Sequence, residues 1–230
     1  MDQFSSFSLI HGLTLLGCFV AIGVLVAVGV RRRGAGTEAS LRRGLGWFGL
    51  GFFVVHQIYW GTPPRLDPSE SLPLHVCDLN GLIAPLALLT GKRWLRAVLY
   101  FWGIGLSLQG LVQPVIEQGP ATSRFWFFFV SHALIVGYAA YDVIVARFRP
   151  NLRDLGVVAV ASLAYYAVMI PLNIATGWNY GYLGSQDDQP GAIAALGAWP
   201  LRLVVLFGVG FMIFVALWLP WAIAGKRRPS

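Results

Sequence analysis

The chain has 230 residues, of which 57% are hydrophobic and only 12% are charged, and its mean hydropathy is +0.66. Soluble domains carry roughly 25% charged residues, so this composition excludes an ordinary soluble domain and indicates a membrane protein. The net charge of +7 at pH 7 would suit a nucleic-acid-binding protein, unless the basic residues gather at the cytoplasmic ends of membrane helices.

Seven apolar segments, each bounded by charged residues, Pro or Gly, are long enough to cross a bilayer. They are predicted at residues 7–30, 44–60, 73–91, 95–115, 125–146, 155–176 and 200–224. They leave no room for a soluble domain, so we expect one all-α transmembrane bundle over residues 1–230. The first segment is too long for a cleavable signal, and Asp2 but no Lys or Arg precedes it, so we expect a retained helix. Gly81 and Pro85 interrupt the third segment, where a broken or re-entrant helix stays open.

Basic residues gather at alternate ends of these segments. Fourteen of the seventeen Lys and Arg residues lie at one set of ends: Arg31, Arg32, Arg33, Arg42, Arg43, Lys92, Arg93, Arg96, Arg147, Arg149, Arg153, Lys226, Arg227 and Arg228. Because cytoplasmic loops of membrane proteins are enriched in Lys and Arg, this pattern predicts an outside amino terminus and a cytoplasmic carboxyl terminus. The expected location is the plasma membrane. The positive charge is therefore explained by the orientation of the helices in the membrane, and nucleic-acid binding is disfavoured.

With this orientation, the polar residues of six segments fall in the outer half of the membrane. They are His11, His56, His75, Cys77, Asp78, Asn80, Gln109, Gln113, His132 and Asn173, followed by Asn179 and Tyr180 in the adjoining loop. Ionisable groups inside a membrane are costly and generally face the bundle interior or a wet cavity. We therefore expect a functional site in this layer. The structural alternative is a hydrogen-bonded network that locks the helices together.

The two cysteines have different surroundings, and both lie in apolar stretches that do not suggest a disulfide. Cys18 has no charged neighbour and is interpreted as a small apolar filler. Cys77 lies in the string HVCDLNG and is a candidate nucleophile, which needs a base to form the thiolate. On a helix, His75 would lie about 160° from Cys77 but about 60° from Asp78. Asp78 is thus expected to orient His75, and the base for Cys77 is expected from another helix.

His132 and His56 are the available bases, and the depth of His132 in its segment favours it. A zinc site is the main chemical alternative, since Cys, His and carboxylate are zinc ligands. Only the pair His75 and Cys77 is close in sequence, and the chain contains no HExxH or CxxC motif. We therefore expect neither a metal nor a cofactor. Asp142, near the cytoplasmic end of its segment and close to Arg147, is expected to be structural or interfacial.

Several strings resemble one family of membrane proteins. They are LPLHVCDLNGLIAPLALLTGKR, YFWGIGLSLQGL, FFFVSHALIVGYAAYD, the single residue Asn173, the string Asn179-Tyr180-x-Tyr182-Leu183, and Leu196-Gly197-x-Trp199-Pro200. In these strings the chain resembles the bacterial YwaF-type membrane proteins and their eukaryotic relative, transmembrane protein 164. The resemblance covers most of the chain beyond residue 45, and its most specific mark is Pro-Leu-His-x-Cys-Asp.

The resemblance implies a cysteine-dependent acyltransferase that moves fatty acyl groups onto lysophospholipids, distantly related to the androgen-induced threonine hydrolases of lipid esters. Carried over by position, it makes Cys77 the nucleophile and His132 its general base. Asn173 and Asn179 become candidates for orienting the histidine or holding the oxyanion, with His75 and Asp78 as supports. Membrane phospholipids or lysophospholipids are then the expected partners.

The sequence thus favours a lipid acyltransferase or lipid-ester hydrolase whose site opens to the outer leaflet. The alternative from another class is a transporter, channel or small-ligand receptor that uses the same polar layer as a binding site. Polar residues are scarce in the cytoplasmic half of the predicted segments, where a transport pathway would need them. That scarcity argues against a transport function.

Overall fold

The computed structural model describes residues 4–226, without the side chains of Ala192 and Lys226. Three residues used above, Asp2, Arg227 and Arg228, lie outside the described residues. Within residues 4–226 the regular structure is entirely helical. The predicted all-α class is therefore confirmed for the part of the chain that the structure covers.

The α-helices follow the predicted segments in order, and the fourth predicted segment corresponds to α4 and α5 together. The α-helices are α1 (Leu9–Gly34), α2 (Glu38–Trp60), α3 (Val76–Thr90), α4 (Arg93–Trp102), α5 (Leu108–Val112), α6 (Ser123–Ile144), α7 (Leu152–Thr176) and α8 (Leu201–Lys226). A π-helix, η1 (Gly103–Ser107), joins α4 to α5, and these three elements form one continuous rod. Two short 3-10 helices, η2 (Tyr180–Tyr182) and η3 (Gly191–Leu196), lie between α7 and α8.

Side-chain caps explain why several helices begin earlier than the apolar pattern predicts. The Asn151 side chain accepts hydrogen bonds from the backbone N–H groups of Arg153 and Asp154, so α7 starts at Leu152 rather than at residue 155. Thr122 caps α6 in the same way through the N–H of Phe125. The side-chain oxygen of a cap replaces a missing backbone acceptor, which allows a helix to include polar first turns.

The third predicted segment is one unbroken helix, which resolves the question of a break. α3 contains Pro85 but runs without interruption over its 15 residues. At 1.5 Å per residue it is roughly 22 Å long, shorter than the roughly 30 Å hydrocarbon core. The helix ends at Gly91, whose φ of 64° places it in the left-handed region that favours glycine. The short α3 therefore begins inside the bundle, with residues 61–75 as a loop before it.

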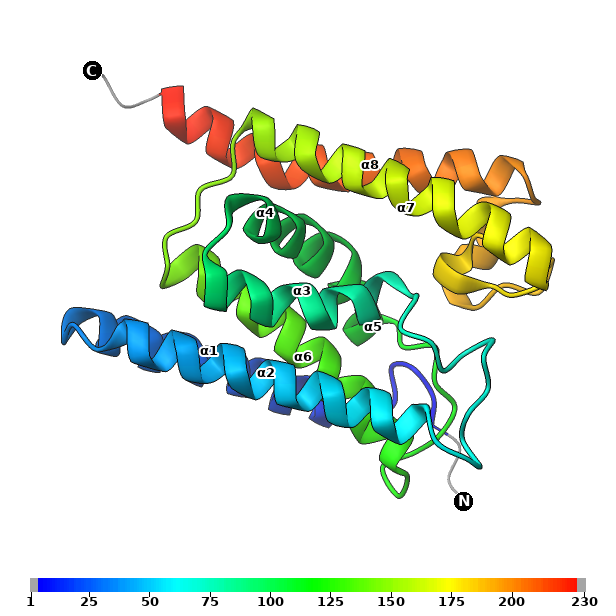
Figure 1. Cartoon of the computed structure of the whole chain (residues 1–230), viewed down its shortest axis with the longest axis horizontal. Helices are drawn as coiled ribbons and strands as arrows, with labels where there is room; N and C mark the ends of the chain where they lie inside the picture. Colours follow the sequence, from blue (N-terminus) through cyan, green and yellow to red (C-terminus); the bar gives the residue numbers. More distant parts are fainter. Residues whose placement is uncertain (1–3, 227–230) are drawn as a thin grey trace.

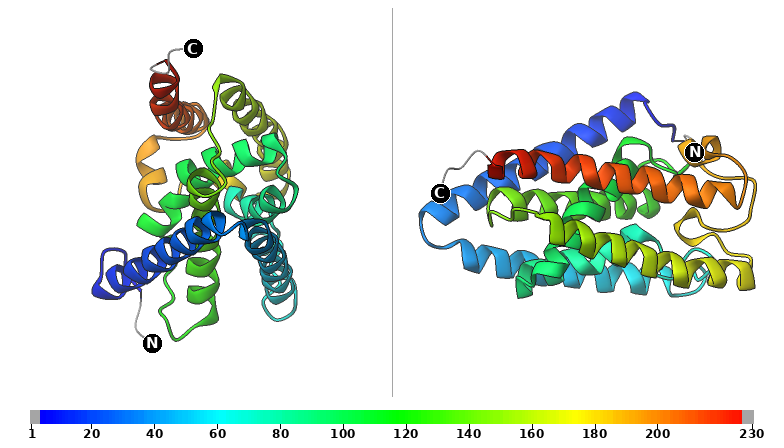
Figure 2. Two further views of the ribbon diagram at one scale, coloured as in Figure 1. Left: turned by 90° about the vertical axis from the view of Figure 1, so that its left-hand side faces the viewer. Right: turned by 90° about the horizontal axis from the view of Figure 1, so that it is seen from above.

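The helices are arranged in layers (Figure 1), with α1 and α2 on one side and α7 and α8 on the other. Between them lie α3, α6 and the α4–η1–α5 rod, and α3 packs against both α2 and α4. The two further views in Figure 2 show the long helices running in roughly the same direction. The inner helices therefore form most of the buried core, and the outer helices form most of the surface.

The burial of the helices fits a membrane environment. Within the described residues, α1, the α4–η1–α5 rod, α6, α7 and α8 are long and apolar enough to cross a membrane. In the most apolar stretch of the rod 61% of the residues are buried, whereas in those of α1 and α8 only 6% of the residues are buried. Val24 and Val204, for example, are 58% and 69% exposed. Such continuous exposed apolar surface is typical of helices that face lipid.

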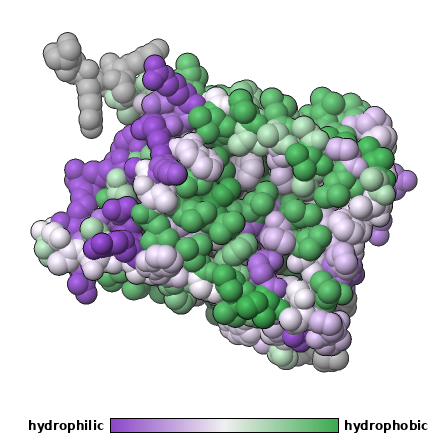
Figure 3. All heavy atoms as spheres, in the orientation of Figure 1, coloured by the Kyte–Doolittle hydropathy of each residue, from purple (hydrophilic) through white to green (hydrophobic). Residues whose placement is uncertain are grey.

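The two ends of the bundle differ in charge. The α1–α2, α3–α4 and α6–α7 connections lie at one end together with the carboxyl end of α8, and we call this the basic end. Hydrophilic residues concentrate there in Figure 3, while apolar residues cover the middle of the molecule. Residues 61–75, 113–122 and 177–200 lie at the opposite end. The charge asymmetry read from the sequence therefore corresponds to the two ends of the folded bundle.

Candidate functional site

Cys77 lies in the first turn of α3, where it faces the π-helix of the neighbouring rod. The side-chain amide of Asn80 donates a hydrogen bond of 3.3 Å to the Ser107 hydroxyl, and both residues are fully buried. The Ser107 hydroxyl also lies beside the Cys77 thiol. The side-chain oxygen of Asn80 has no partner among the described residues. A π-helix inserts an extra residue into a helix, and such turns occur frequently at functional sites.

His132 presents one free ring nitrogen. Its Nδ1 lies 2.8 Å from the Phe128 carbonyl oxygen, which can only accept, so Nδ1 carries the proton. In the neutral imidazole, Nε2 is then an unprotonated acceptor, and it has no hydrogen-bond partner among the described residues. The ring packs directly against Gly110: a methyl group at that position would meet Nε2 and would come within 2.5 Å of the ring carbon Cδ2. The fit of His132 therefore depends on glycine at residue 110.

Cys77 and His132 are connected through the rod. Cys77 lies beside Ser107, and the His132 ring lies against Gly110, three residues further along. Residues three apart on a helix share one face and lie about one turn from each other. The Cys77 thiol and the His132 ring thus lie against neighbouring turns of the α4–η1–α5 rod.

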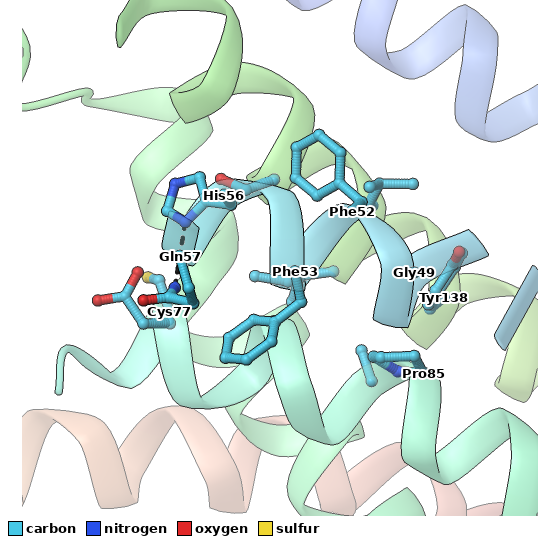
Figure 4. Close-up of a pocket in the computed structure, with 14 residues that line it drawn as sticks. Gly49, Phe52, Phe53, His56, Gln57, Cys77, Pro85 and Tyr138 are labelled. Atoms are coloured by element: carbon cyan, nitrogen blue, oxygen red, sulfur yellow. Dashed lines mark hydrogen bonds between the residues drawn. The ribbon is translucent and has the colours of Figure 1, made fainter. Parts of the chain in front are cut away.

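A narrow pocket also reaches Cys77 from the side of α2. It lies between α2, α3 and α6, and its cavity volume of about 30 Å³ has room for about two water molecules. Figure 4 shows His56, Gln57 and Cys77 at one end of this pocket, and Gly49, Pro85 and Tyr138 at the other. Phe52 and Phe53 of α2 together with Leu134 and Ile135 of α6 make much of the remaining wall apolar, and Asp78 and Ser131 add polar groups to it.

His56 shares this pocket with Cys77, but both of its ring nitrogens are engaged. Nε2 accepts a hydrogen bond of 3.2 Å from the Trp60 indole, and Nδ1 meets the Gln57 side-chain amide at 3.2 Å. His56 and His132 are the two candidate bases from the sequence. His56 would have to lose a hydrogen bond before it could accept a proton, whereas His132 would not.

His75 and Asp78 do not interact in the way the helix geometry suggested. The Asp78 carboxylate accepts a hydrogen bond of 3.3 Å from the backbone N–H of His75, so Asp78 caps the start of α3. The His75 ring is held elsewhere: its Nδ1 accepts from the Gly181 N–H at 3.4 Å, and it packs between Tyr180 and Tyr182. The expectation that Asp78 orients the His75 ring is therefore wrong, because residue 75 precedes the helix and its ring turns toward the η2 loop.

The η2 loop brings a further polar group to the cysteine. Burial raises the pKa of the Tyr182 phenol, and the nearby Cys77 and Asp78 raise it further. The phenol therefore stays protonated and can donate a hydrogen bond near the thiol. The loop needs glycine at residue 181, where φ is 67° and a Cβ atom would come within 2.9 Å of the Tyr165 ring.

Asn173, Asn179 and Tyr180 build this loop and do not face the thiol. The Asn173 amide makes two hydrogen bonds, of 2.8 and 3.0 Å, with the backbone of Tyr180. The Asn179 amide donates to Gln189 and accepts from the Gly184 N–H. The Tyr180 hydroxyl donates to the Pro68 carbonyl at 2.7 Å. These hydrogen bonds hold the two amides and the Tyr180 phenol in the fold of the loop.

Three other members of the predicted layer lie outside the site. Gln109 and Gln113 are exposed on the rod, so the structure does not bring them to Cys77. His11 is fully buried and structural: its Nε2 donates to the Leu111 carbonyl at 2.8 Å, and its Nδ1 accepts from the Phe7 N–H. Helical rise gives the depth of a residue correctly but not the direction of its side chain, which explains these corrections.

Four residues of the site were not singled out by the sequence as site residues. They are Gln57, Ser107, Gly110 and Tyr182. Tyr182 stands in the Asn-Tyr-x-Tyr string, which is the one sequence signal that includes it. Ser107 and Gly110 come to the site through the π-turn, which shifts the helical register and leaves no mark in an apolar pattern.

One known family of proteins matches this chain. The family model described as the TMEM164 family matches residues 4–218, which is most of the chain. The chain belongs to the TMEM164 family. The match confirms the predicted relation to transmembrane protein 164, while the resemblance to the bacterial YwaF-type proteins stays a prediction. Together with the apolar helices, family membership identifies a membrane protein. No curated protein and no solved structure matches the chain.

Proposed function

We propose that the protein is a membrane-embedded lipid acyltransferase or lipid-ester hydrolase, with Cys77 as nucleophile and His132 as general base. The observation that carries the proposal is the free Nε2 of His132, whose ring lies against the turn of the rod next to the one beside the Cys77 thiol. A cysteine nucleophile requires a neighbouring base, and a base requires an unprotonated, unpaired nitrogen. His132 supplies that nitrogen without breaking an existing hydrogen bond.

In the proposed reaction, Nε2 of His132 takes the proton of the Cys77 thiol, and the thiolate attacks the carbonyl carbon of an acyl ester. The tetrahedral intermediate collapses to a thioester on Cys77 as the alcohol leaves with the proton from His132. A lysophospholipid hydroxyl or water then attacks the thioester, with His132 as base again. The acceptor decides between a transferase and a hydrolase.

The oxyanion of the intermediate needs hydrogen-bond donors, and we assign Asn80 and Tyr182 to this role. The Asn80 amide is buried next to Ser107, and the protonated Tyr182 phenol lies near the thiol. Fixed donors in a water-poor site stabilise developing negative charge more strongly than donors in water. Asn173 and Asn179, whose amides fold the η2 loop, take no part in this assignment.

The apolar pocket between α2 and α3 is proposed to receive the acyl chain. From Cys77 to Pro85 it extends along α3 for eight residues, or roughly 12 Å. Its cavity volume of about 30 Å³ holds water but no lipid chain, so binding requires α2 to move away from α3. The site lies near the end opposite to the basic end, which the positive-inside rule assigns to the outer leaflet of the plasma membrane.

Turnover of a labelled lipid tests the assignment of both groups. Purified protein in lipid nanodiscs is given phosphatidylcholine with a labelled acyl chain and an unlabelled lysophospholipid, and acyl transfer and free fatty acid are measured. Cys77→Ser and His132→Ala are expected to lose at least about 100-fold in rate, the usual contribution of a general base. Cys18→Ser is the matched control, because Cys18 lies on the outer helix α1. His56→Ala tests the other candidate base, whose ring nitrogens already have hydrogen-bond partners.

The outcomes separate the candidate bases. Full turnover in Cys77→Ser would remove the cysteine mechanism. Turnover lost in His56→Ala but kept in His132→Ala would move the base to α2.

A further inference from the structure

A second cavity lies at the basic end, far along the helices from Cys77. Its volume is about 420 Å³, within the range of small-ligand sites. Four arginines and two carboxylates from α1, α2, α4 and α6 with the turn after it contribute to its wall: Arg33, Glu38, Arg42, Arg96, Asp142 and Arg147. A cavity with this lining is not explained by the acyl-transfer chemistry proposed above.

Both carboxylates of the cavity already have an arginine partner. Nε of Arg96 lies 2.9 Å from each oxygen of Asp142, which is 3% exposed. Nε of Arg42 lies 3.3 Å from Glu38, one helical turn away on α2. Two of the four arginines are thereby neutralised.

Arg33 and Arg147 are not neutralised by a carboxylate. Arg33 donates to the Val145 carbonyl at 2.9 Å and forms no ion pair among the described residues. Arg147 makes neither a side-chain hydrogen bond nor an ion pair within residues 4–226, and its φ of 56° is uncommon for a residue with a side chain. The cavity wall therefore carries a surplus of two positive charges. Cations that share a cavity repel each other unless an anion occupies it.

We infer that this cavity binds a phosphate group, carried by a phospholipid headgroup or by a soluble phosphate ester. Guanidinium groups bind phosphate oxygens through two parallel N–H donors. Two unpaired guanidinium groups balance the roughly two negative charges of a phosphate monoester and exceed the single charge of a phosphodiester. The basic end lies at headgroup level if the arginines mark the cytoplasmic surface of the membrane. This site is separate from Cys77 and does not rest on the proposed acyl transfer.

Native mass spectrometry of the detergent-purified protein tests the inference with three probes. Phosphatidylglycerol and a diacylglycerol with the same chains differ in the phosphate-bearing headgroup, and inorganic phosphate represents the soluble source. Phosphatidylglycerol or inorganic phosphate is expected to bind, and diacylglycerol is not. Arg33→Gln and Arg147→Gln are each expected to raise the Kd about tenfold, the usual effect of losing a hydrogen bond to a charged group. Arg31→Gln is the matched control, since Arg31 lies in the same turn of α1 but not in the cavity wall.

The source of the phosphate follows from which probe binds. Binding of phosphatidylglycerol alone, abolished in the double variant, identifies a lipid headgroup. Binding of inorganic phosphate, or its displacement of the lipid, identifies a soluble ligand. Unchanged Kd values in the double variant would overturn the inference, as would failure of the wild type to bind either phosphate probe. If the double variant does not fold, Arg33→Lys with Arg147→Lys keeps the charge without the two-donor geometry. Weaker binding by that variant supports the inference, and wild-type binding overturns it.

Discussion

The four histidines differ in what their ring nitrogens contact. His11 uses both nitrogens for backbone partners, and His56 meets Trp60 and Gln57. His75 accepts a hydrogen bond at Nδ1, so its Nε2 carries the proton and cannot act as a base in the neutral ring. His132 has the opposite arrangement, with the proton on Nδ1 and a free Nε2. The hydrogen-bond partners of each ring therefore set its chemical role.

His11 is predicted to matter for stability and not for turnover. His11→Ala removes the buried hydrogen bond that joins α1 to the Leu111 carbonyl of α5, and a local one from the Phe7 N–H, at a cost of about 1–3 kcal/mol in the free energy of unfolding. Thermal melting in detergent and turnover per folded molecule measure the two effects. A large loss of turnover in a folded His11→Ala protein would contradict this assignment.

Gly110 is predicted to be required for the position of His132. Gly110→Ala places a methyl group against the imidazole, so the ring must shift from its place against the rod. Overpacking of this kind costs about 1–3 kcal/mol, and the rate of acyl transfer should fall while the fold persists. Gly51→Ala on α2 is the control, because a methyl group there meets no atom within 4 Å. Equal rates for the two variants would show that the His132 position is not critical.

Some site residues follow from the sequence and others do not. Cys77 and His132 were predicted together because both are reactive groups at matching depth in apolar segments. Ser107 and Gly110 were not, because a hydroxyl and a glycine in an apolar helix are usually packing residues. Their role depends on the direction of a side chain across a helix contact, which is a tertiary property.

At the scale of the element, the start of α3 and the π-turn position the site. Asp78 holds the backbone of His75, which fixes where the helix begins and hence where Cys77 points. The π-helix η1 places Ser107 next to Asn80. Both features are local, yet only the first has a sequence signature, an acidic residue three positions after the cap.

The cap function of Asp78 can be separated from its charge. Asp78→Ala removes the acceptor and is expected to cost about 1 kcal/mol in the free energy of unfolding. Asp78→Asn keeps a side-chain oxygen for the His75 N–H and should cost only a few tenths of that. Chemical denaturation of the two variants measures the difference. Equal losses in both would show that the carboxylate charge is what matters.

At the scale of the whole molecule, the apolar pattern located all the long helices but not their ends. α1 and α8 run past their predicted boundaries into the basic end, and α2 begins at Glu38 rather than at residue 44. Hydropathy reports which residues prefer lipid, whereas a helix ends where its backbone groups find other partners. For α3 the difference has the opposite sign, because the helix runs only from Val76 to Thr90 and is shorter than the predicted segment at 73–91.

The proposed location in the plasma membrane, with the basic end in the cytoplasm, predicts which end is accessible from outside the cell. In a Cys18→Ser background, Ser185→Cys at the opposite end should react with a membrane-impermeant maleimide on intact cells. Ala35→Cys, which is equally exposed but lies at the basic end, should react only after the membrane is opened. The background protein without an added cysteine corrects for Cys77. Labelling of Ala35→Cys in intact cells would invert the orientation and move the site to the inner leaflet.

The covalent intermediate on Cys77 is the most direct measure of the proposed chemistry. The protein is incubated with phospholipid carrying a heavy-isotope acyl chain and no acceptor, then digested and analysed by mass spectrometry. We predict a labelled, hydroxylamine-sensitive thioester on the peptide that contains Cys77, absent in Cys77→Ser and strongly reduced in His132→Ala. Lipid turnover at the wild-type rate by Cys77→Ser, with no acyl group on the Cys77 peptide of the wild type, would contradict the cysteine mechanism.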